Sequence, residues 1–196
     1  HLQMMRDENI RGFSLTIPHK ENAIPLVDKL SSEAEKIAAV NTVVNDAGVL
    51  KGYNTDCYGI SQAFSEQSIS LKDKKVLIYG AGGATRAAIY VLKEEGAAEI
   101  FLANRTLARA EEVAKEFSVD VVSEIDLSSI DVFINATPIG SHLGEGMSYP
   151  FSVDDFSEKH VVFDMVTKDT ELLEIAAKNG AKTIHGLRML LFQALK

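Results

Sequence analysis

The sequence is poor in the features on which several classes of protein depend. It contains a single cysteine, Cys57, which excludes an intrachain disulfide and a structural zinc site built from cysteines. Its histidines are scattered without the spacing of metal ligands, so we expect no metal site. Basic residues are dispersed and the formal net charge is −8, which argues against a nucleic-acid partner.

Long apolar runs are also missing. No run approaches the roughly 20 residues that a membrane-spanning helix requires, and the N-terminus lacks the pattern of a signal peptide. Together with the lone cysteine, these features predict a soluble protein of the reducing cytoplasm with no membrane partner.

What is present is the composition of an ordinary globular protein. The chain has 196 residues, of which 46% are hydrophobic and 24% are charged. That length can bury a core in one large domain or two small ones. The sequence begins with histidine, and an apolar helical pattern still runs at Lys196, so we expect a chain truncated at both ends.

The first part of the chain has the pattern of a small α/β unit. A strand is predicted at residues 12–18, because Pro18 cannot donate to a sheet and would stop it. Asp56 stands at the N-cap position of a helix predicted at 58–67. The other elements predicted here are helical segments at 20–29 and 31–38 and strands at 40–45 and 49–52.

From residue 74 the pattern changes to short apolar runs that alternate with helical segments. The run at 74–80 ends in glycines, as expected for a strand buried on both faces of a parallel sheet. Such alternation predicts an α/β fold with a Rossmann-type doubly wound parallel sheet, preceded by a smaller, incomplete α/β domain. We place the boundary in the polar stretch 68–73, which gives domains at 1–70 and 71–196. The further predicted strands are 99–103, 119–122, 131–135, 160–164 and 182–184, and the predicted helices are 84–95, 107–117, 171–179 and from 187 onward.

A glycine-rich turn connects the strand at 74–80 to the helix that follows it. Gly80 permits the tight turn, and Gly82 lets the backbone approach a pyrophosphate at the N-terminus of the helix. Thr85 occupies the third small position, where glycine or alanine is usual. The placement of this turn between a strand and a helix favours dinucleotide binding over a plain connection.

The end of the next strand selects between cofactors. A protein specific for NAD has an acidic residue at this point, about 20 residues after the glycines, which binds the ribose 2′-hydroxyl. This chain instead has Asn104, Arg105 and Thr106, with Arg109 one helical turn later. Two guanidinium groups would bind a 2′-phosphate through charge-assisted hydrogen bonds, whereas the alternative is a pair of solvated surface arginines. We therefore predict NADP(H) as the cofactor.

Polar residues also stand beside strand ends and helix starts in the first part. Thr16 and Lys20 lie around the end of the first predicted strand, Asn41 lies in the next strand, and Asp56 precedes a helix. Each has an ordinary explanation when taken singly, as a strand residue, a solvated cation or a helix cap. All of them could also converge on one cleft.

In combination and in order, the motifs of the chain resemble those of shikimate dehydrogenase. They are SLTIPHK, AVNT, YNTD, GAGGATR, NRT, NATPIG and HGLRMLLFQA, and they extend over nearly the whole chain. The resemblance implies an NADP-dependent oxidoreductase that interconverts 3-dehydroshikimate and shikimate in aromatic amino-acid biosynthesis, on the route to chorismate. Its partner would be this small-molecule substrate, and a homodimer is left open.

Matched position by position, the resemblance implies roles for individual residues. Lys20 and Asp56 correspond to the catalytic pair, and a lysine beside a carboxylate can hold, donate or accept the proton that accompanies hydride transfer. Thr16, Asn41 and Gln193 correspond to residues that bind the substrate hydroxyls. The residues of the cofactor site are Gly80, Gly82, Gly83 and Ala84 in the pyrophosphate loop, Asn104, Arg105, Thr106 and Arg109 around the adenosine phosphate, and Thr137, Met165 and Gly186 beside the nicotinamide.

Three features depart from the family pattern. No segment corresponds to the family's opening strand, whose Ser-x-Ser pair binds the substrate carboxylate, so we expect this chain alone to be inactive or impaired. The segment 163–170 is shorter than usual and has Thr167 where the family has tyrosine, and Ser14 stands in place of an asparagine. These departures leave two alternatives, a quinate/shikimate dehydrogenase with relaxed cofactor use and a non-catalytic NADP-binding fragment.

Overall fold

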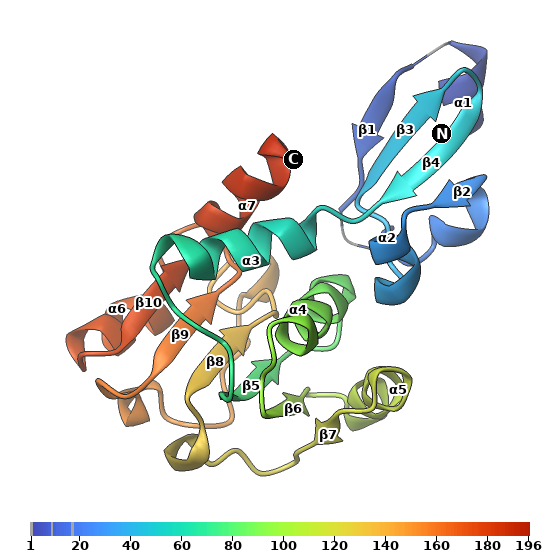
Figure 1. The fold of residues 1–196 in the computed structure, drawn as a ribbon. Coiled ribbons are helices and arrows are strands. Elements are labelled where there is room, and N and C mark those ends of the chain that lie inside the picture. The colour runs from blue at the N-terminus through green and yellow to red at the C-terminus, as the bar shows by residue number, and fades with distance from the viewer. Residues whose placement is uncertain (1, 9, 17) are drawn as a thin grey trace.

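Two β-sheets organise the chain (Figure 1). The computed structural model describes residues 2–8, 10–16 and 18–196, so position 17 of the strand predicted at 12–18 lies outside the described residues. Strands before residue 54 form a four-stranded sheet, and strands from residue 75 onward form a six-stranded sheet. The predicted fold class, a Rossmann-type parallel sheet preceded by a smaller α/β unit, is confirmed.

The six-stranded sheet is parallel throughout. Its strands are β5 (Lys75–Tyr79), β6 (Glu99–Ala103), β7 (Asp120–Val121), β8 (Val132–Asn135), β9 (Val161–Asp164) and β10 (Lys182–His185). They lie in the order β10-β9-β8-β5-β6-β7. Val76 and Ile78 of β5 enter one core cluster and Leu77 and Tyr79 the other, because successive side chains of a strand point to opposite faces. Both faces are therefore covered, which explains the continuous apolar runs.

Helices provide that cover (Figure 1). They are α3 (Asp56–Glu66), α4 (Gly83–Glu94), α5 (Leu107–Phe117), α6 (Glu171–Lys178) and α7 (Gly186–Leu195). Residues of α3, α4, α5 and α7 join the core cluster that contains Val76, and residues of α6 join the cluster that contains Leu77. The side chain of Thr170 accepts a hydrogen bond from the backbone N–H of Leu173, which satisfies one free donor at the start of α6.

The four-stranded sheet carries the first part of the chain. Its strands are β1 (Gly12–Ser14), β2 (Lys29–Leu30), β3 (Thr42–Asp46) and β4 (Val49–Tyr53), in the order β1-β3-β4-β2. β3 and β4 form an antiparallel hairpin, whose turn holds Ala47 and Gly48 at φ of 52° and 90°. Met5 of α1 (Leu2–Asp7) and Ala34 of α2 (Ser32–Ile37) enter its core. The 3-10 helices of the chain are η1 (Ile24–Leu26), η2 (Leu127–Ser129), η3 (His142–Gly144) and η4 (Val153–Asp155).

Some local predictions for the first part were wrong. Residues 20–29 form turns, η1 and the start of β2 rather than a helix, because Pro25 removes a backbone donor and Lys29 pairs with β4. The first strand ends at Ser14 instead of residue 18, and α1 was not predicted. Asp56 is not the N-cap of α3: Thr55 takes that position, and Asp56 is the first helical residue.

α3 connects the two parts of the fold. It follows β4 of the smaller sheet directly, yet it packs against α7 and α4, which cover the larger sheet. The division into domains at residues 1–70 and 71–196 stays a prediction. Among the helices that the structure describes, none has both the length and the apolar character needed to cross a membrane.

Candidate active site

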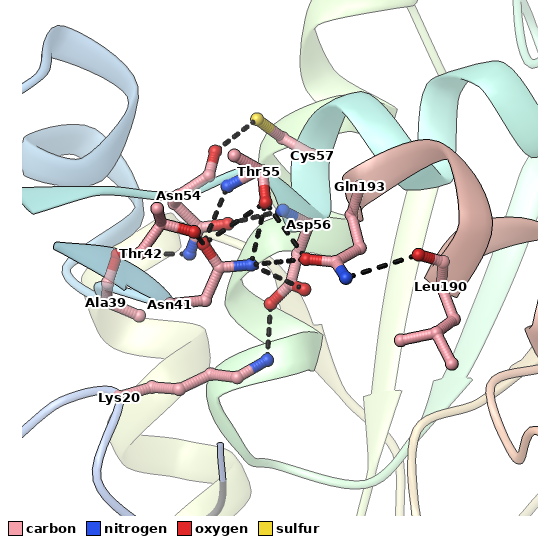
Figure 2. Close-up of polar contacts among 10 residues, drawn as sticks. All are labelled: Lys20, Ala39, Asn41, Thr42, Asn54, Thr55, Asp56, Cys57, Leu190 and Gln193. Carbon is pink, nitrogen blue, oxygen red and sulfur yellow. Dashed lines mark hydrogen bonds and ion pairs between the residues drawn. The ribbon is translucent and has the colours of Figure 1, made fainter. Parts of the chain in front are cut away.

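A lysine–aspartate pair lies where the first part of the chain meets the larger sheet (Figure 2). Lys20 Nζ donates a hydrogen bond to Asp56 Oδ2 over 2.5 Å, and the two side chains are 15% and 5% exposed. Lys20 is in the turn after β1, where its carbonyl accepts the backbone N–H of Val40. Asp56 begins α3, and its own N–H donates to Asn54 Oδ1. A charged pair this little exposed interacts more strongly than a surface pair, because water screens it less.

Asn41 fixes the orientation of the aspartate. Its Nδ2 donates to Asp56 Oδ1 over 2.9 Å, so the carboxylate accepts from Lys20 on one oxygen and from Asn41 on the other. The Oδ1 atom of Asn41 accepts the backbone N–H of Thr55 over 2.9 Å, which determines which end of the amide faces the carboxylate. Asn41 is 3% exposed, so its hydrogen bonds face little competition from water.

Gln193 brings the C-terminal helix into the same network. Its Oε1 accepts a hydrogen bond from Thr55 Oγ1 over 3.0 Å and lies 3.4 Å from Asn41 Nδ2 (Figure 2). α7 can come this close because Gly59 of α3 has no side chain: a Cβ there would lie 2.5 Å from the carbonyl oxygen of Met189. Thr55 lies in the motif YNTD but is not among the predicted site residues, because its partners Asn41 and Gln193 come from distant segments of the chain.

Thr16 does not join this network. The residue is exposed, its carbonyl accepts the N–H of His19, and no hydrogen bond links its side chain to the described residues. Of the predicted catalytic and substrate residues, the structure therefore brings Lys20, Asn41, Asp56 and Gln193 into one network, of which Thr16 is not a member. The predicted roles of these residues stay predictions.

A cavity of about 610 Å³ borders the network but is not its centre. Thr42, Asn54 and Thr55 line part of it, whereas Lys20 and Asp56 do not. Much of the remaining lining comes from α3 and α4, and Glu94 at the end of α4 and Glu95 directly after it add negative charge. The charged pair, not this cavity, is therefore the better marker of the candidate chemistry.

The glycine-rich turn lies at the carboxyl end of β5. Gly80 has φ of 123°, and a Cβ there would lie 2.8 Å from the carbonyl carbon of Ala136, so a side chain is excluded twice over. A Cβ at Gly82 would meet nothing within 4 Å, which leaves room for a ligand at the start of α4. The Thr85 hydroxyl donates to Gly80 O and accepts from Gly82 N, so this buried threonine holds the loop closed. Ala84 follows in the first turn of α4.

The predicted phosphate clamp follows β6. The carbonyl of Thr106 accepts hydrogen bonds from Asn104 Nδ2 and from the backbone N–H of Arg109. The turn into α5 is therefore held by one residue before Thr106 and one after it. Arg105 and Arg109 are exposed, and no ion pair of either is found within the described part of the chain. Two unneutralised guanidinium groups beside the glycine loop suit a dianionic phosphate. These residues and the space at Gly82 fit a dinucleotide that carries a 2′-phosphate.

Two of the residues predicted beside the nicotinamide, Thr137 and Met165, are hydrogen-bonded to Asn135 of a buried polar cluster. Asn135 Oδ1 accepts from the backbone N and the hydroxyl of Thr137, and Asn135 Nδ2 donates to Asp164 Oδ1 over 2.9 Å. Gly186 lies against the backbone of Met165, since a Cβ there would come within 2.5 Å of its carbonyl. Thr137, Met165 and Gly186 thus meet at the carboxyl ends of β8, β9 and β10, where open α/β sheets bind their ligands.

Asp164 is the charged member of this cluster. Burial raises the pKa of its carboxyl, while hydrogen bonds from Thr170, Val166 and Asn135 act in the opposite direction. A raised pKa in the folded state means that the ionised form is disfavoured by folding. The resulting cost is absent at pH values below the ordinary carboxyl pKa and develops as the pH rises from there to the raised value.

Asp164→Asn should therefore change stability in a pH-dependent way. As the pH rises above about 4, the free energy of unfolding of the variant should increase relative to that of the unaltered protein, so the variant becomes relatively more stable. The gain should be about 1.4 kcal/mol for each unit of pKa shift. Urea unfolding of both proteins across a pH series measures this difference.

Asp126 offers a control of opposite sign. It is exposed, and hydrogen bonds from Ser128 lower the pKa of its carboxyl, so it stabilises the fold above its ordinary pKa. The stability of the Asp126→Asn variant, relative to the unaltered protein, should accordingly fall as the pH rises. A pH-independent difference for Asp164→Asn, or one with the same sign as for Asp126→Asn, would contradict the assignment of the Asp164 shift to burial.

Comparison with known proteins points to one family. The family model described as the shikimate dehydrogenase substrate binding domain matches residues 1–43, and the one described as shikimate / quinate 5-dehydrogenase matches residues 62–142. A shikimate dehydrogenase (NADP(+)) from Caldanaerobacter subterraneus subsp. tengcongensis is 40% identical to this chain, over 94% of the chain and 70% of that relative.

Solved structures agree in fold over almost the whole chain. The crystal structure of shikimate dehydrogenase from Aquifex aeolicus gives a TM-score of 0.91 at 38% identity, covering 97% of this chain and 71% of that one. Shikimate 5-dehydrogenase from Thermus thermophilus, in complex with NADP(H) and shikimate, gives 0.87 at 37% identity, covering 98% of this chain and 72% of that one.

Proposed function

The chain belongs to the shikimate dehydrogenase family. We propose that it acts as an NADP-dependent oxidoreductase that interconverts 3-dehydroshikimate and shikimate. The observation that carries this proposal is the Lys20–Asp56 pair, which is little exposed and lies next to the glycine loop through the contact of Lys20 with Gly83. Reduction of a ring ketone needs a proton at the oxygen as well as a hydride at the carbon, and this pair is placed to handle the proton.

The cofactor site is proposed on the same basis. Gly80, Gly82, Gly83 and Ala84 would hold the pyrophosphate, and Asn104, Arg105, Thr106 and Arg109 would hold the adenosine 2′-phosphate. Thr137, Met165 and Gly186 would flank the nicotinamide. When bound, NADP(H) supplies or accepts the hydride.

Each residue near the substrate then has a separate task. In the reductive direction, Lys20 Nζ donates the proton to the substrate oxygen, and in the oxidative direction it removes that proton. Asp56 Oδ2 accepts a hydrogen bond from Nζ over 2.5 Å and so fixes the position of the lysine nitrogen. Asn41 keeps the aspartate in place, while Asn41, Thr16 and Gln193 would bind the hydroxyl groups of the substrate.

Steady-state kinetics of the protein test the proposal. Shikimate with NADP⁺ should give the highest kcat/KM among the four combinations of shikimate or quinate with NADP⁺ or NAD⁺. Preferred oxidation of quinate would favour the quinate/shikimate alternative, to which the replacement of a tyrosine by Thr167 points. Binding of NADPH without turnover of either substrate would favour a non-catalytic role, against which the intact Lys20–Asp56 contact argues.

Location and assembly are part of the same proposal. We place the enzyme in the cytoplasm, where the single cysteine, Cys57, would stay reduced. A homodimer is the assembly to test by analytical ultracentrifugation, in which a sedimentation coefficient of the single chain at micromolar concentration would exclude it.

Gln193→Ala tests the assignment of the C-terminal helix to substrate binding. The variant loses the amide that meets Thr55 and Asn41, and with it a contact to the substrate, so KM for shikimate should rise by about tenfold. The value of kcat should fall less, and the Kd for NADPH should not change. Gln67→Ala is the matched control, because Gln67 is exposed and its side-chain amide donates to the carbonyl of Thr183. Equal kinetics of the two variants would remove Gln193 from the substrate site.

A further inference from the structure

The turn that carries Lys20 touches the first turn of α4 at two points. The stem of Lys20 lies over Gly83, where an added Cβ would come within 3.3 Å of Lys20 Cβ and 3.4 Å of Cδ. The carboxylate of the next residue, Glu21, lies 3.8 Å from Nε of Arg86. Gly83 and Arg86 are three residues apart in α4 and so share one face of the helix. Consecutive residues of the turn, Lys20 and Glu21, thus meet two neighbouring residues on one face of α4.

Arg86 is held firmly at its other end. Its side chain is 8% exposed, Nη1 lies 2.6 Å from Glu116 Oε2, and the guanidinium stands 5.7 Å from the centre of the Phe117 ring. Both contacts belong to the last turn of α5. The guanidinium is therefore fixed within the larger sheet's layer of helices rather than free to follow the turn. A rigid planar fork of this kind can hold two carboxylates at once.

One donor of this arginine is unsatisfied. Nε is buried and has no hydrogen-bond partner among the described residues, although Glu21 Oε2 lies within ion-pair distance. A buried donor without an acceptor is costly, so a small approach of Glu21 would be favourable. Because Glu21 directly follows Lys20 in the chain, this contact ties the turn that carries Lys20 to the start of α4.

We propose that Arg86 is a positioning residue, whose ion pair with Glu21 holds Lys20 against the start of α4. This inference rests on the proposed function, since it concerns how Lys20 is placed for proton transfer. Arg86 acts through Glu21 and does not touch the reacting atoms. Through Glu21, Arg86 links Lys20, which is proposed to handle the proton, to α4, which follows the cofactor loop. The guanidinium group of Arg86 thus helps to place Lys20 relative to that loop.

A pair of matched variants separates this role from a structural one. Glu21→Gln and Glu116→Gln each remove one negative charge from the same arginine, and the side chains are similarly exposed at 44% and 41%. Only Glu21 is joined to Lys20. The first readout is the rate at which Lys20 Nζ reacts with acetic anhydride, followed by mass spectrometry without substrate or cofactor. The second is the set of kcat, KM and Kd for NADPH.

Glu21→Gln should raise the modification rate of Lys20 by about threefold or more and lower kcat by about three- to tenfold, with the Kd for NADPH unchanged. Glu116→Gln should leave both the Lys20 rate and kcat within about twofold, because the Phe117 ring still holds the guanidinium and the contact of Arg86 with Glu21 is kept. Equal effects of the two variants, or an unchanged Lys20 rate in Glu21→Gln, would overturn the proposal. If the unaltered protein fails to oxidise shikimate, the proposed function fails, but the modification rates still decide whether Arg86 positions Lys20.

Discussion

Lys20→Ala should lower kcat for shikimate oxidation by about 10²- to 10⁴-fold, which is the usual contribution of a positioned general acid or base. Nζ of Lys20 is 2.5 Å from Asp56 Oδ2 and its side chain is 15% exposed, so bulk water is a poor substitute for the missing ammonium group. The Kd for NADPH should stay unchanged, because the arginines that are proposed to favour NADPH, Arg105 and Arg109, follow β6 and lie on another segment. Steady-state kinetics and calorimetry on the natural protein measure the two quantities.

Asp56→Asn should also lower kcat strongly, as Lys20→Ala does, because it changes the hydrogen bonds that hold Lys20. The carboxylate accepts from Lys20 on one oxygen and from Asn41 on the other. An asparagine has only one acceptor oxygen, so either Lys20 or Asn41 would face an NH₂ group. The lysine would lose its charge partner and, in one of the two orientations, its hydrogen bond as well.

Two further substitutions show whether Lys20 acts through its proton or only through its charge. Lys20→Arg keeps a positive charge, but a guanidinium group does not release its proton at accessible pH, so kcat should stay low. Lys115→Ala removes an exposed lysine of α5 and should leave kcat unchanged. Near-normal turnover of Lys20→Arg would restrict Lys20 to electrostatic binding, and near-normal turnover of Lys20→Ala would exclude it from the site.

The larger sheet could be predicted closely from the sequence because its information is local. Continuous apolar runs specify strands that are buried on both faces, and the predicted strand at 99–103 and helix at 107–117 coincide with β6 and α5. The glycine loop is equally local, since Gly80 needs a positive φ and Gly82 needs open space on one chain segment. Even the unusual Thr85 is explained once its hydrogen bonds to Gly80 and Gly82 are seen.

The candidate site was less predictable because it depends on contacts between distant segments. Asp56 suits an N-cap by its residue type, yet the approach of Lys20 and Asn41 makes a different use of its carboxylate. Nothing in the local pattern indicates that Gly59 lets α7 approach until Gln193 reaches Thr55. Motif resemblance supplied the names of several of these residues, but their mutual placement required the packing of α3 against α7.

The other large expected effect is on the preference of the chain for NADPH over NADH. The unaltered chain should bind NADPH more tightly than NADH, and Arg105→Ala should remove most of that difference. A lost charge-assisted hydrogen bond to phosphate costs about 1.5–3 kcal/mol, which corresponds to roughly a 10- to 150-fold rise in the Kd for NADPH. The Kd for NADH should not change, since it has no 2′-phosphate for the arginine to bind. Calorimetry with both nucleotides measures the ratio.

Charge and position can be separated in the same experiment. Arg105→Glu should invert the preference, because an acidic residue at this point repels a phosphate and accepts a hydrogen bond from a ribose 2′-hydroxyl. Arg109→Ala should weaken NADPH binding as well. Arg11→Ala removes another exposed arginine, just before β1 of the smaller sheet, and should change the affinity for neither nucleotide. Added salt should reduce the preference of the unaltered chain, since Arg105 and Arg109 are exposed and open to screening. Equal affinity of the unaltered chain for NADPH and NADH at low salt would show that these two arginines are ordinary surface residues and not a phosphate clamp.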